Sequence, residues 1–169
     1  MTYQKVPRPV HFCNCGDHAW STLTKGYVTL VSPEDAHFLQ ERAWTAKADA
    51  GKKVVYARST YRRLHRKIVA ATSSVIVDHE SGNGLDNRRH NLRETTIQQN
   101  CQNGTAHKDS TSKFKGVSWY KDYQKWRVSI YVSGKQKCLG YFDDEETAAE
   151  IYDEAALKHF GPYARLNFV

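Results

Sequence analysis

Residues 77–100, VDHESGNGLDNRRHNLRETTIQQN, constrain the fold of this chain more than any other stretch. The apolar run VIVDH at 75–79 has the length and the β-branched residues of a strand. The segment SGNGLDN at 81–87 is rich in glycine and asparagine, which predicts a turn-rich loop. A second strand over 92–96 and a short helix over 97–103 complete the predicted order: strand, loop, strand, helix.

Four polar residues of this stretch have the chemistry for hydrolysing a phosphodiester. His79 is the candidate general base, because an ordinary histidine pKa of about 6.5 leaves the imidazole largely neutral at pH 7. Asn91 is expected to hold that imidazole in its working tautomer and orientation. Asp78 and Asn100 offer a carboxylate and an amide oxygen, a set that suits one Mg²⁺ or Mn²⁺ ion when water and phosphate oxygens complete its coordination.

This stretch and the preceding LHRKIVA resemble the HNH nuclease motif of phage and intron homing endonucleases. The resemblance implies a ββα-metal fold, in which His79 activates water and Asp78 and Asn100 hold one cation. The last position of the motif is asparagine here, as in the homing subgroup. The LHR segment, 64–66, is shared with that subgroup, which implies a supporting part; His65 and His90 are expected to have packing or surface roles and no catalytic role.

Charge is distributed unevenly along the 169 residues, whose formal net charge is +7. Seven basic and no acidic side chains lie within 52–67, and eight basic and two acidic ones lie within 108–137. Seven acidic residues and no basic one gather in 143–154. Two basic patches favour a polyanionic partner, and nucleic acid is the leading candidate.

The last third of the chain reads as a separate module of three strands and one helix. The predicted strands are FKGVSWY (114–120), KWRVSIYV (125–132) and KCLGYF (137–142). The helix is expected to start with a capping box of Asp143 and Glu146 and to stop at Gly161. Its alanine-rich stripe would pack on one face of the sheet and leave the other face free. We predict that this free face binds DNA through Lys115, Trp119, Lys125, Arg127, Ser129, Tyr131, Lys135 and Lys137.

Residues 114–168 resemble the plant ethylene-response-factor (Apetala-type) DNA-binding domain in the signatures FKGV, KWRVSI, LGYF and ARLNF. The resemblance implies that the sheet enters the major groove of duplex DNA while the helix backs it. Plant domains have arginine and tryptophan on the third strand, where this chain has Gln136 and Cys138, and an acidic residue in place of Ser129. The target sequence therefore does not carry over.

The segment HFCNCGDH offers four metal-ligating side chains, His11, Cys13, Cys15 and His18. The alternatives are a structural zinc site and a metal-free loop, and the tight Cys-x-Cys spacing favours the loop. A disulfide framework is not expected from four cysteines in a chain without a secretion signal. No apolar run approaches the roughly 18 residues of a membrane span, so we expect a cytoplasmic protein with no membrane partner.

Together these features predict an α+β protein with an HNH nuclease domain and leader over 1–103, a linker over 104–112 and an Apetala-type domain over 113–169. The expected activity is metal-dependent cleavage of double-stranded DNA by a phage-borne, homing-type enzyme in a bacterial host, with Arg93 as a further DNA contact. One alternative is a DNA-binding regulator with an inactive nuclease half, and another is an RNA-binding or structural zinc protein. No small-molecule substrate is expected. The sequence leaves the oligomeric state, the target site and the number of strands cut open.

Overall fold

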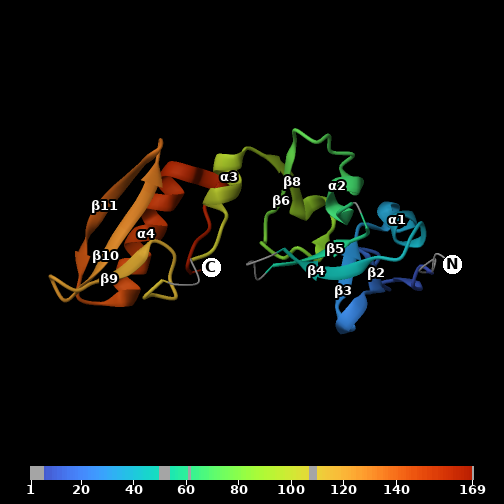
Figure 1. Cartoon of the computed structure of the whole chain (residues 1–169), viewed down its shortest axis with the longest axis horizontal. Coiled ribbons are helices and arrows are strands. Elements are labelled where there is room, and N and C mark those ends of the chain that lie inside the picture. The colour runs from blue at the N-terminus through green and yellow to red at the C-terminus, as the bar shows by residue number, and fades with distance from the viewer. Residues whose placement is uncertain (1–5, 50–53, 61, 107–109, 169) are drawn as a thin grey trace. The chain divides into compact units, whose positions relative to one another are not determined.

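The computed structural model describes residues 6–49, 54–60, 62–106 and 110–168 (Figure 1). The chain forms two compact units, 1–96 and 97–169, that mix short strands with few helices. The boundary between the units, after residue 96, therefore comes before the helix predicted over 97–103, which the sequence assigns to the nuclease domain. Within the described residues, no helix is both long and apolar enough to cross a membrane.

A four-stranded sheet with the order β1-β2-β3-β7 forms much of the first unit. Its strands are β1 (Val10–Phe12), β2 (Ala19–Thr22), β3 (Val28–Val31) and β7 (Asp86–Asn87). The first three pair antiparallel, whereas β7 pairs parallel with β3. The two residues of β7 come from the end of the predicted loop, and this pairing attaches the loop to the sheet.

Two antiparallel strand pairs complete the sheets of this unit: β4 (Thr45–Ala48) with β5 (Val55–Arg58), and β6 (Ile76–His79) with β8 (Leu92–Thr95). Residues 50–53, in the connection between the strands of the first pair, lie outside the described residues. The second pair confirms the two strands predicted around the loop. Its register places Asp78 opposite Arg93 and His79 opposite Leu92.

The helices of the first unit are short. They are α1 (His37–Gln40), α2 (Leu64–Ile68) and the 3-10 turns η1 (Thr24–Gly26), η2 (Pro33–Asp35) and η3 (Arg89–Asn91). Helix α2 ends at Ile68, and Ala70 shortly after it takes a positive φ of 50°, which a right-handed helix does not allow. Leu64 and Ile68 of α2 are both buried, so the apolar face of the helix packs inwards as its spacing predicts. The buried core of the unit consists of Ala19, Leu23, Val31, Ala36, Leu39, Trp44, Ala57, Leu64 and Ile68.

The second unit contains the expected three-stranded antiparallel sheet packed on one helix, with the strand order β11-β10-β9 (Figure 1). Its elements are α3 (Ile97–Gln102), β9 (Val117–Tyr120), β10 (Lys125–Val132), β11 (Lys135–Phe142), α4 (Glu145–Phe160) and the 3-10 turn η4 (Gly161–Tyr163). Three buried alanines of α4, Ala148, Ala149 and Ala156, lie in one core with Val128 and Ile130 of the central strand. Small side chains on the helix therefore allow a close approach to the sheet, as the alanine stripe predicts.

The helix cap of α4 differs from the prediction by one residue. Asp144 is the N-cap, and its Oδ2 accepts a hydrogen bond of 2.7 Å from the backbone N–H of Thr147. The capping box expected from Asp143 and Glu146 is therefore wrong, and Asp143 instead lies 3.1 Å from the ammonium group of Lys125. Gly161 ends the helix with a positive φ of 52°, as predicted.

Candidate active site and nucleic-acid interface

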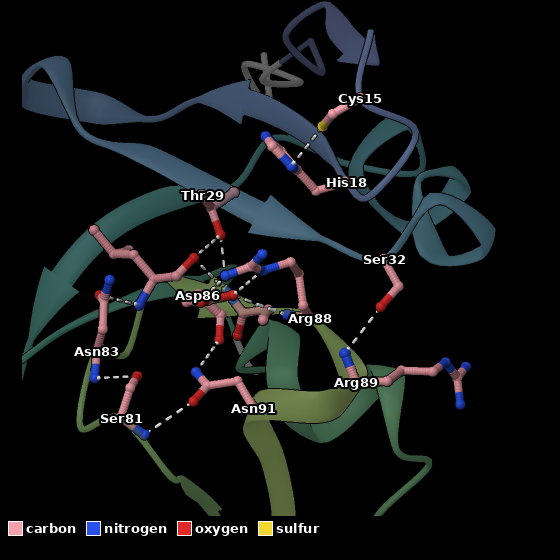
Figure 2. Close-up of polar contacts among 12 residues, drawn as sticks. Cys15, His18, Thr29, Ser32, Ser81, Asn83, Asp86, Arg88, Arg89 and Asn91 are labelled. Carbon is pink, nitrogen blue, oxygen red and sulfur yellow. Dashed lines mark hydrogen bonds and ion pairs between the residues drawn. The ribbon is translucent and has the colours of Figure 1, made fainter. Parts of the chain in front are cut away.

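Asn91 fastens the loop that joins β6 to β8. Its side-chain oxygen accepts a hydrogen bond of 2.9 Å from the backbone N–H of Ser81, and its amide nitrogen donates one of 2.7 Å to the carbonyl oxygen of Asp86 (Figure 2). The backbone carbonyl of Asn91 also accepts from the N–H of Glu80 at 2.9 Å. One buried side chain thus satisfies backbone groups at both ends of the loop, which an irregular buried segment requires.

A different asparagine, Asn87, contacts the candidate base. Its side-chain oxygen lies 3.1 Å from Nε2 of His79, and Asn87 is fully buried on β7. Asn91 was predicted to orient the imidazole; the described contacts of its side chain are to the loop backbone, so an orienting role through the loop stays a prediction. The loop contains several asparagines, and spacing alone does not show which one reaches the histidine.

The hydrogen bonds of Asn87 determine the tautomer of His79. The amide nitrogen of Asn87 donates to the carbonyl oxygen of Leu85 at 3.2 Å and to the hydroxyl of Thr29 at 2.8 Å. The Thr29 hydroxyl in turn donates to the same Leu85 carbonyl at 2.9 Å. The Asn87 atom that faces His79 is therefore the oxygen, which only accepts, so Nε2 carries the proton. Nδ1 of the neutral ring then holds the lone pair that a general base needs.

His79 lies among other rings in a buried environment. Its ring centroid is 4.7 Å from that of His65 on α2 and 5.8 Å from that of Tyr56 on β5. Burial lowers the pKa of His79, although the hydrogen bond to Asn87 and the charge of Asp78 act in the opposite direction. The candidate base is therefore neutral near pH 7.

His65 is a constituent of this site, for which the sequence predicted no catalytic role. Only 2% of its surface is exposed, and burial, followed by the neighbouring charges of His79, Arg63 and Arg66, lowers its pKa to about 3. A ring that stays neutral near pH 7 beside His79 fits a packing role, which is one of the two roles that the sequence allowed. The LHR segment was the available signal, but its position against His79 depends on the packing of α2. His90 is exposed, so of the two roles that the sequence allowed it has the surface one.

Glycine is required where the loop passes β5. A Cβ atom on Gly84 would lie 2.5 Å from the carbonyl oxygen of Val55 and 2.7 Å from the ring of Tyr56. The loop is also held at Asp86, whose carboxylate accepts from Arg88 at 2.8 and 2.7 Å. These contacts hold the loop against the ring that neighbours His79.

Two further contacts join the loop to the segment after β3. Ser32 precedes η2 but makes no capping hydrogen bond, and its hydroxyl accepts from the backbone N–H of Arg89 at 2.9 Å (Figure 2). Asp35, which is 1% exposed, accepts two hydrogen bonds of 2.8 and 2.7 Å from the Arg89 guanidinium. Arg89 therefore anchors η3 through a paired contact with a buried carboxylate.

Asp78 adjoins the candidate base and carries the carboxylate predicted to bind a metal. It is 9% exposed, and its Oδ2 lies 3.3 Å from the guanidinium of Arg93, which also lies 3.7 Å from Glu80. Arg93, predicted to contact DNA, thus borders the site. Asn100 lies on α3, which belongs to the second unit, so its role as the second metal ligand stays a prediction.

The sheet of the second unit divides the predicted DNA-contacting residues between its two faces. Directly paired residues lie on the same face of a sheet. Trp119 pairs with Trp126, Lys137 with Ile130, and Lys135 with Val132, and all three partners belong to the core against α4 or pack on it. The expected placement of Trp119, Lys135 and Lys137 on the free face is therefore wrong. The free face keeps Lys125, Arg127, Ser129 and Tyr131, and the register adds Tyr120, Gln136, Cys138 and Tyr141.

Lys115 lies ahead of β9 in a half-buried position. Its ammonium group donates to the carbonyl oxygen of Gln102, and burial lowers its pKa to about 8. Lys115 therefore has a structural role in the second unit, and its partly buried ammonium group is poorly placed to contact DNA. Arg127 lies on the free face, with its guanidinium 5.5 Å from the centre of the Tyr120 ring.

The cysteine-rich segment forms the turn between β1 and β2. Cys13 and Cys15 are joined by a disulfide, and the Cys15 sulfur lies 3.8 Å from Nδ1 of His18 (Figure 2). The pairing corrects the expectation of no disulfide for these two residues, whereas Cys101 and Cys138 are free and exposed. His11 stacks on Trp20 with ring centres 4.3 Å apart and does not join the other three side chains.

The sequence of this chain is similar to a phage protein over about half of its length. A protein of Escherichia phage T7, Protein 3.8, is 36% identical over 91 residues, which is 54% of this chain and 74% of the phage protein. This chain belongs to the family of that phage protein. No family model matches the chain, and no solved structure matches it.

Two further classes of relative concern parts of the chain. A protein of Acanthamoeba polyphaga mimivirus, named as an uncharacterized HNH endonuclease, is 35% identical over 95 residues, 56% of this chain and 48% of its own length. The Arabidopsis thaliana AP2-like ethylene-responsive transcription factor TOE2 is 40% identical over 62 residues, 37% of this chain. The chain spans only 13% of that transcription factor. This chain therefore has one class of relative that is HNH-like and another that is AP2-like.

Proposed function

We propose that this protein is a metal-dependent endonuclease of the HNH type that hydrolyses phosphodiester bonds in double-stranded DNA. The observation that carries the proposal is the contact of the Asn87 oxygen with Nε2 of His79, beside the carboxylate of Asp78. The contact orients the imidazole, burial keeps it neutral near pH 7, and the adjacent residue, Asp78, offers an oxygen ligand for a cation. The mimivirus relative named as an HNH endonuclease supports the same chemistry.

In the proposed reaction, His79 accepts a proton at Nδ1 from the water that attacks phosphorus. Asn87 holds the ring through Nε2, and its oxygen stabilises the imidazolium that forms after proton transfer. Asn91 acts on the imidazole indirectly, because it holds the loop that contains Asp86 and leads into β7, the strand of Asn87. Arg93, which lies beside Asp78, would meet the phosphate backbone near the cleaved bond.

Asp78 would hold the divalent cation, with Asn100 as the proposed second ligand. A buried carboxylate with an amide oxygen fits a hard ion such as Mg²⁺ or Mn²⁺ and is a poor match for zinc, which prefers sulfur and nitrogen. When bound, the cation would neutralise charge on the phosphate and stabilise the leaving oxygen.

Two basic surfaces support binding to DNA. In the first unit, a hollow of about 290 Å³ is lined by Arg58, Arg62, Arg63, Arg66, Lys67, Ala71 and Ser73. Asp49 pairs with Arg58 and Arg63, and Glu41 pairs with Lys67, so the five cations outnumber these partner carboxylates. In the second unit, the free sheet face carries Lys125 and Arg127 among aromatic side chains. Both surfaces are suited to a phosphate backbone.

The T7 relative supports the further proposal that the enzyme is phage-borne and acts in the cytoplasm of a bacterial host. The rival function is a DNA-binding regulator with an inactive nuclease half. The test is incubation of the purified protein with supercoiled plasmid in Mg²⁺, in Mn²⁺ and in EDTA, with a gel-shift assay on the same DNA. Cleavage that requires the metal supports the nuclease. If the protein binds duplex DNA but cleaves neither the plasmid nor a library of phage and host DNA, the regulator is favoured.

A further inference from the structure

The turn between β1 and β2 brings together three side chains that bind soft and borderline metals. One ligand atom each from Cys13, Cys15 and His18 lies within 4.8 Å of the others, and this is the one such His, Cys, Asp or Glu group of three or more among the described residues. The turn is distinct from the proposed nuclease site, whose oxygen ligands suit a different class of cation.

The spacing of one pair of ligand atoms matches tetrahedral zinc, whereas the two bonded sulfur atoms would separate on reduction. With Zn–S near 2.3 Å and Zn–N near 2.0–2.1 Å, a sulfur and a nitrogen bound to one tetrahedral zinc lie about 3.6 Å apart. The observed distance from the Cys15 sulfur to Nδ1 of His18 is 3.8 Å. These two residues therefore already have the separation that the ion would impose.

The backbone of the turn is shaped around the sulfur of Cys13. The N–H of Cys15 points to that sulfur at 3.4 Å, and the N–H of Gly16 donates to the carbonyl of Cys13 at 3.0 Å. Gly16 has a φ of +77°, a conformation that favours glycine, and the N–H of Cys13 donates to the carbonyl of His18 at 2.9 Å. An amide directed at a cysteine sulfur stabilises its thiolate, which is the form that binds metal.

The two cysteines exist in alternative chemical states. The structure shows their sulfur atoms joined, and a disulfide offers no thiolate to a metal. Two small-molecule thiols reduce this bond by exchange, so that they become a disulfide and the protein gains two thiols. Zinc would then displace both thiol protons, and its charge would balance the two thiolates.

We propose that the reduced turn binds one Zn²⁺ ion through Cys13, Cys15 and His18, with water as the fourth ligand, and that the disulfide blocks this site. Cys15 is exposed and the other two residues are half-buried, so the ion can enter from solvent. The bound ion would fasten β1 to β2, which pairs with β3, the strand whose Thr29 holds Asn87.

The test uses the full chain, stripped of metal and reduced with a phosphine, and measures zinc by elemental analysis after desalting. Co²⁺ titration reports thiolate ligation through its charge-transfer absorption. We expect about one tightly bound ion per reduced chain, none in the oxidised chain, and a loss of at least about tenfold in affinity in Cys15→Ser and in His18→Asn.

The controls are Cys138→Ser, which removes an exposed free cysteine, and His90→Asn, which removes an exposed histidine; both should bind zinc as the parent chain does. Circular dichroism of each variant shows whether it is folded. Failure of the reduced parent chain to bind zinc overturns the proposal, as does undiminished binding in folded Cys15→Ser or His18→Asn. Neither result bears on DNA cleavage, which is assigned to other residues.

Discussion

The side-chain oxygen of Asn87 lies 3.1 Å from Nε2 of His79, and both residues are buried. The contact joins β7 of the four-stranded sheet to the last residue of β6. It fixes which nitrogen of the imidazole carries a proton, and it makes the orientation of the candidate base depend on a parallel pairing of only two residues.

Replacement of Asn87 by alanine should therefore lower the rate of DNA cleavage. A lost hydrogen bond behind a catalytic group costs about 10- to 100-fold. The measurement is the single-turnover cleavage rate at saturating DNA. The control is Asn83→Ala in the exposed part of the same loop, which should retain most of the activity. Equal losses in both variants would show that the loop as a whole, and not the Asn87 contact, determines the rate.

Replacement of Asn91 by alanine should loosen the loop rather than reorient the ring directly. Its side chain accepts from Ser81 and donates to Asp86, so two backbone partners lose their hydrogen bonds. We expect the free energy of unfolding to fall by about 1–3 kcal/mol. Amide hydrogen exchange at Ser81 should accelerate in Asn91→Ala and stay slow in Asn83→Ala. Unchanged exchange at Ser81 would contradict the anchoring role.

The buried His65 predicts a loss of stability in acid. Its pKa is about 3 in the folded chain, against an ordinary value of about 6.5, so the unfolded chain binds the proton more readily. Stability is retained above pH 6.5 and is lost as the pH falls towards 3, by at most about 1.4 kcal/mol per pH unit from this residue. Chemical denaturation from pH 7 to pH 4 should show a shallower slope for His65→Gln than for the parent chain. His90→Gln, at an exposed position, should keep the parent slope.

Three basic residues that the sequence predicted to bind DNA, Arg127, Lys137 and Lys115, should differ in what their replacement by alanine changes. Arg127→Ala should weaken duplex binding and reduce the salt slope of log Kd by up to about 0.9, because one phosphate contact is lost. Lys137→Ala is the matched control, since its partner Ile130 belongs to the face against α4. Lys115→Ala should lower the thermal midpoint instead, because its ammonium group contacts the carbonyl of Gln102. A larger salt effect from Lys137 than from Arg127 would contradict the assignment of faces.

Local patterns predicted several of the regular elements, because strand alternation and helix stops act over a few residues. Strands β6 and β8 and helix α4 lie close to their predicted positions. The faces of β11 were less predictable, because a bulge shifts the register between Val128 and Ser129. Without that bulge, Lys137 would lie opposite Tyr131, on the free face. The insertion of one residue, Leu139, reverses the orientation of every side chain beyond it, and the signal in the sequence was Gly140, because a glycine inside a strand often marks a bulge.

The candidate base and the neighbouring carboxylate were predictable because they are adjacent in the sequence and their chemistry is specific. The groups that orient the base were not, because they come from distant segments. His65 reaches His79 only through the packing of α2, and Asn87 is held by Thr29 on a strand far earlier in the chain. Spacing identifies which residues have the right chemistry, but tertiary packing selects which of them meet.

The most direct test of the proposed nuclease compares His79→Ala with His90→Ala on supercoiled plasmid in Mg²⁺ or Mn²⁺, with duplex binding measured in parallel. The proposed function predicts that His79→Ala loses cleavage by at least about 100-fold while it still binds DNA, because general-base catalysis contributes that much or more. His90→Ala should cut as the parent chain does. Cleavage at the parent rate by His79→Ala would contradict the assignment of this histidine as the base.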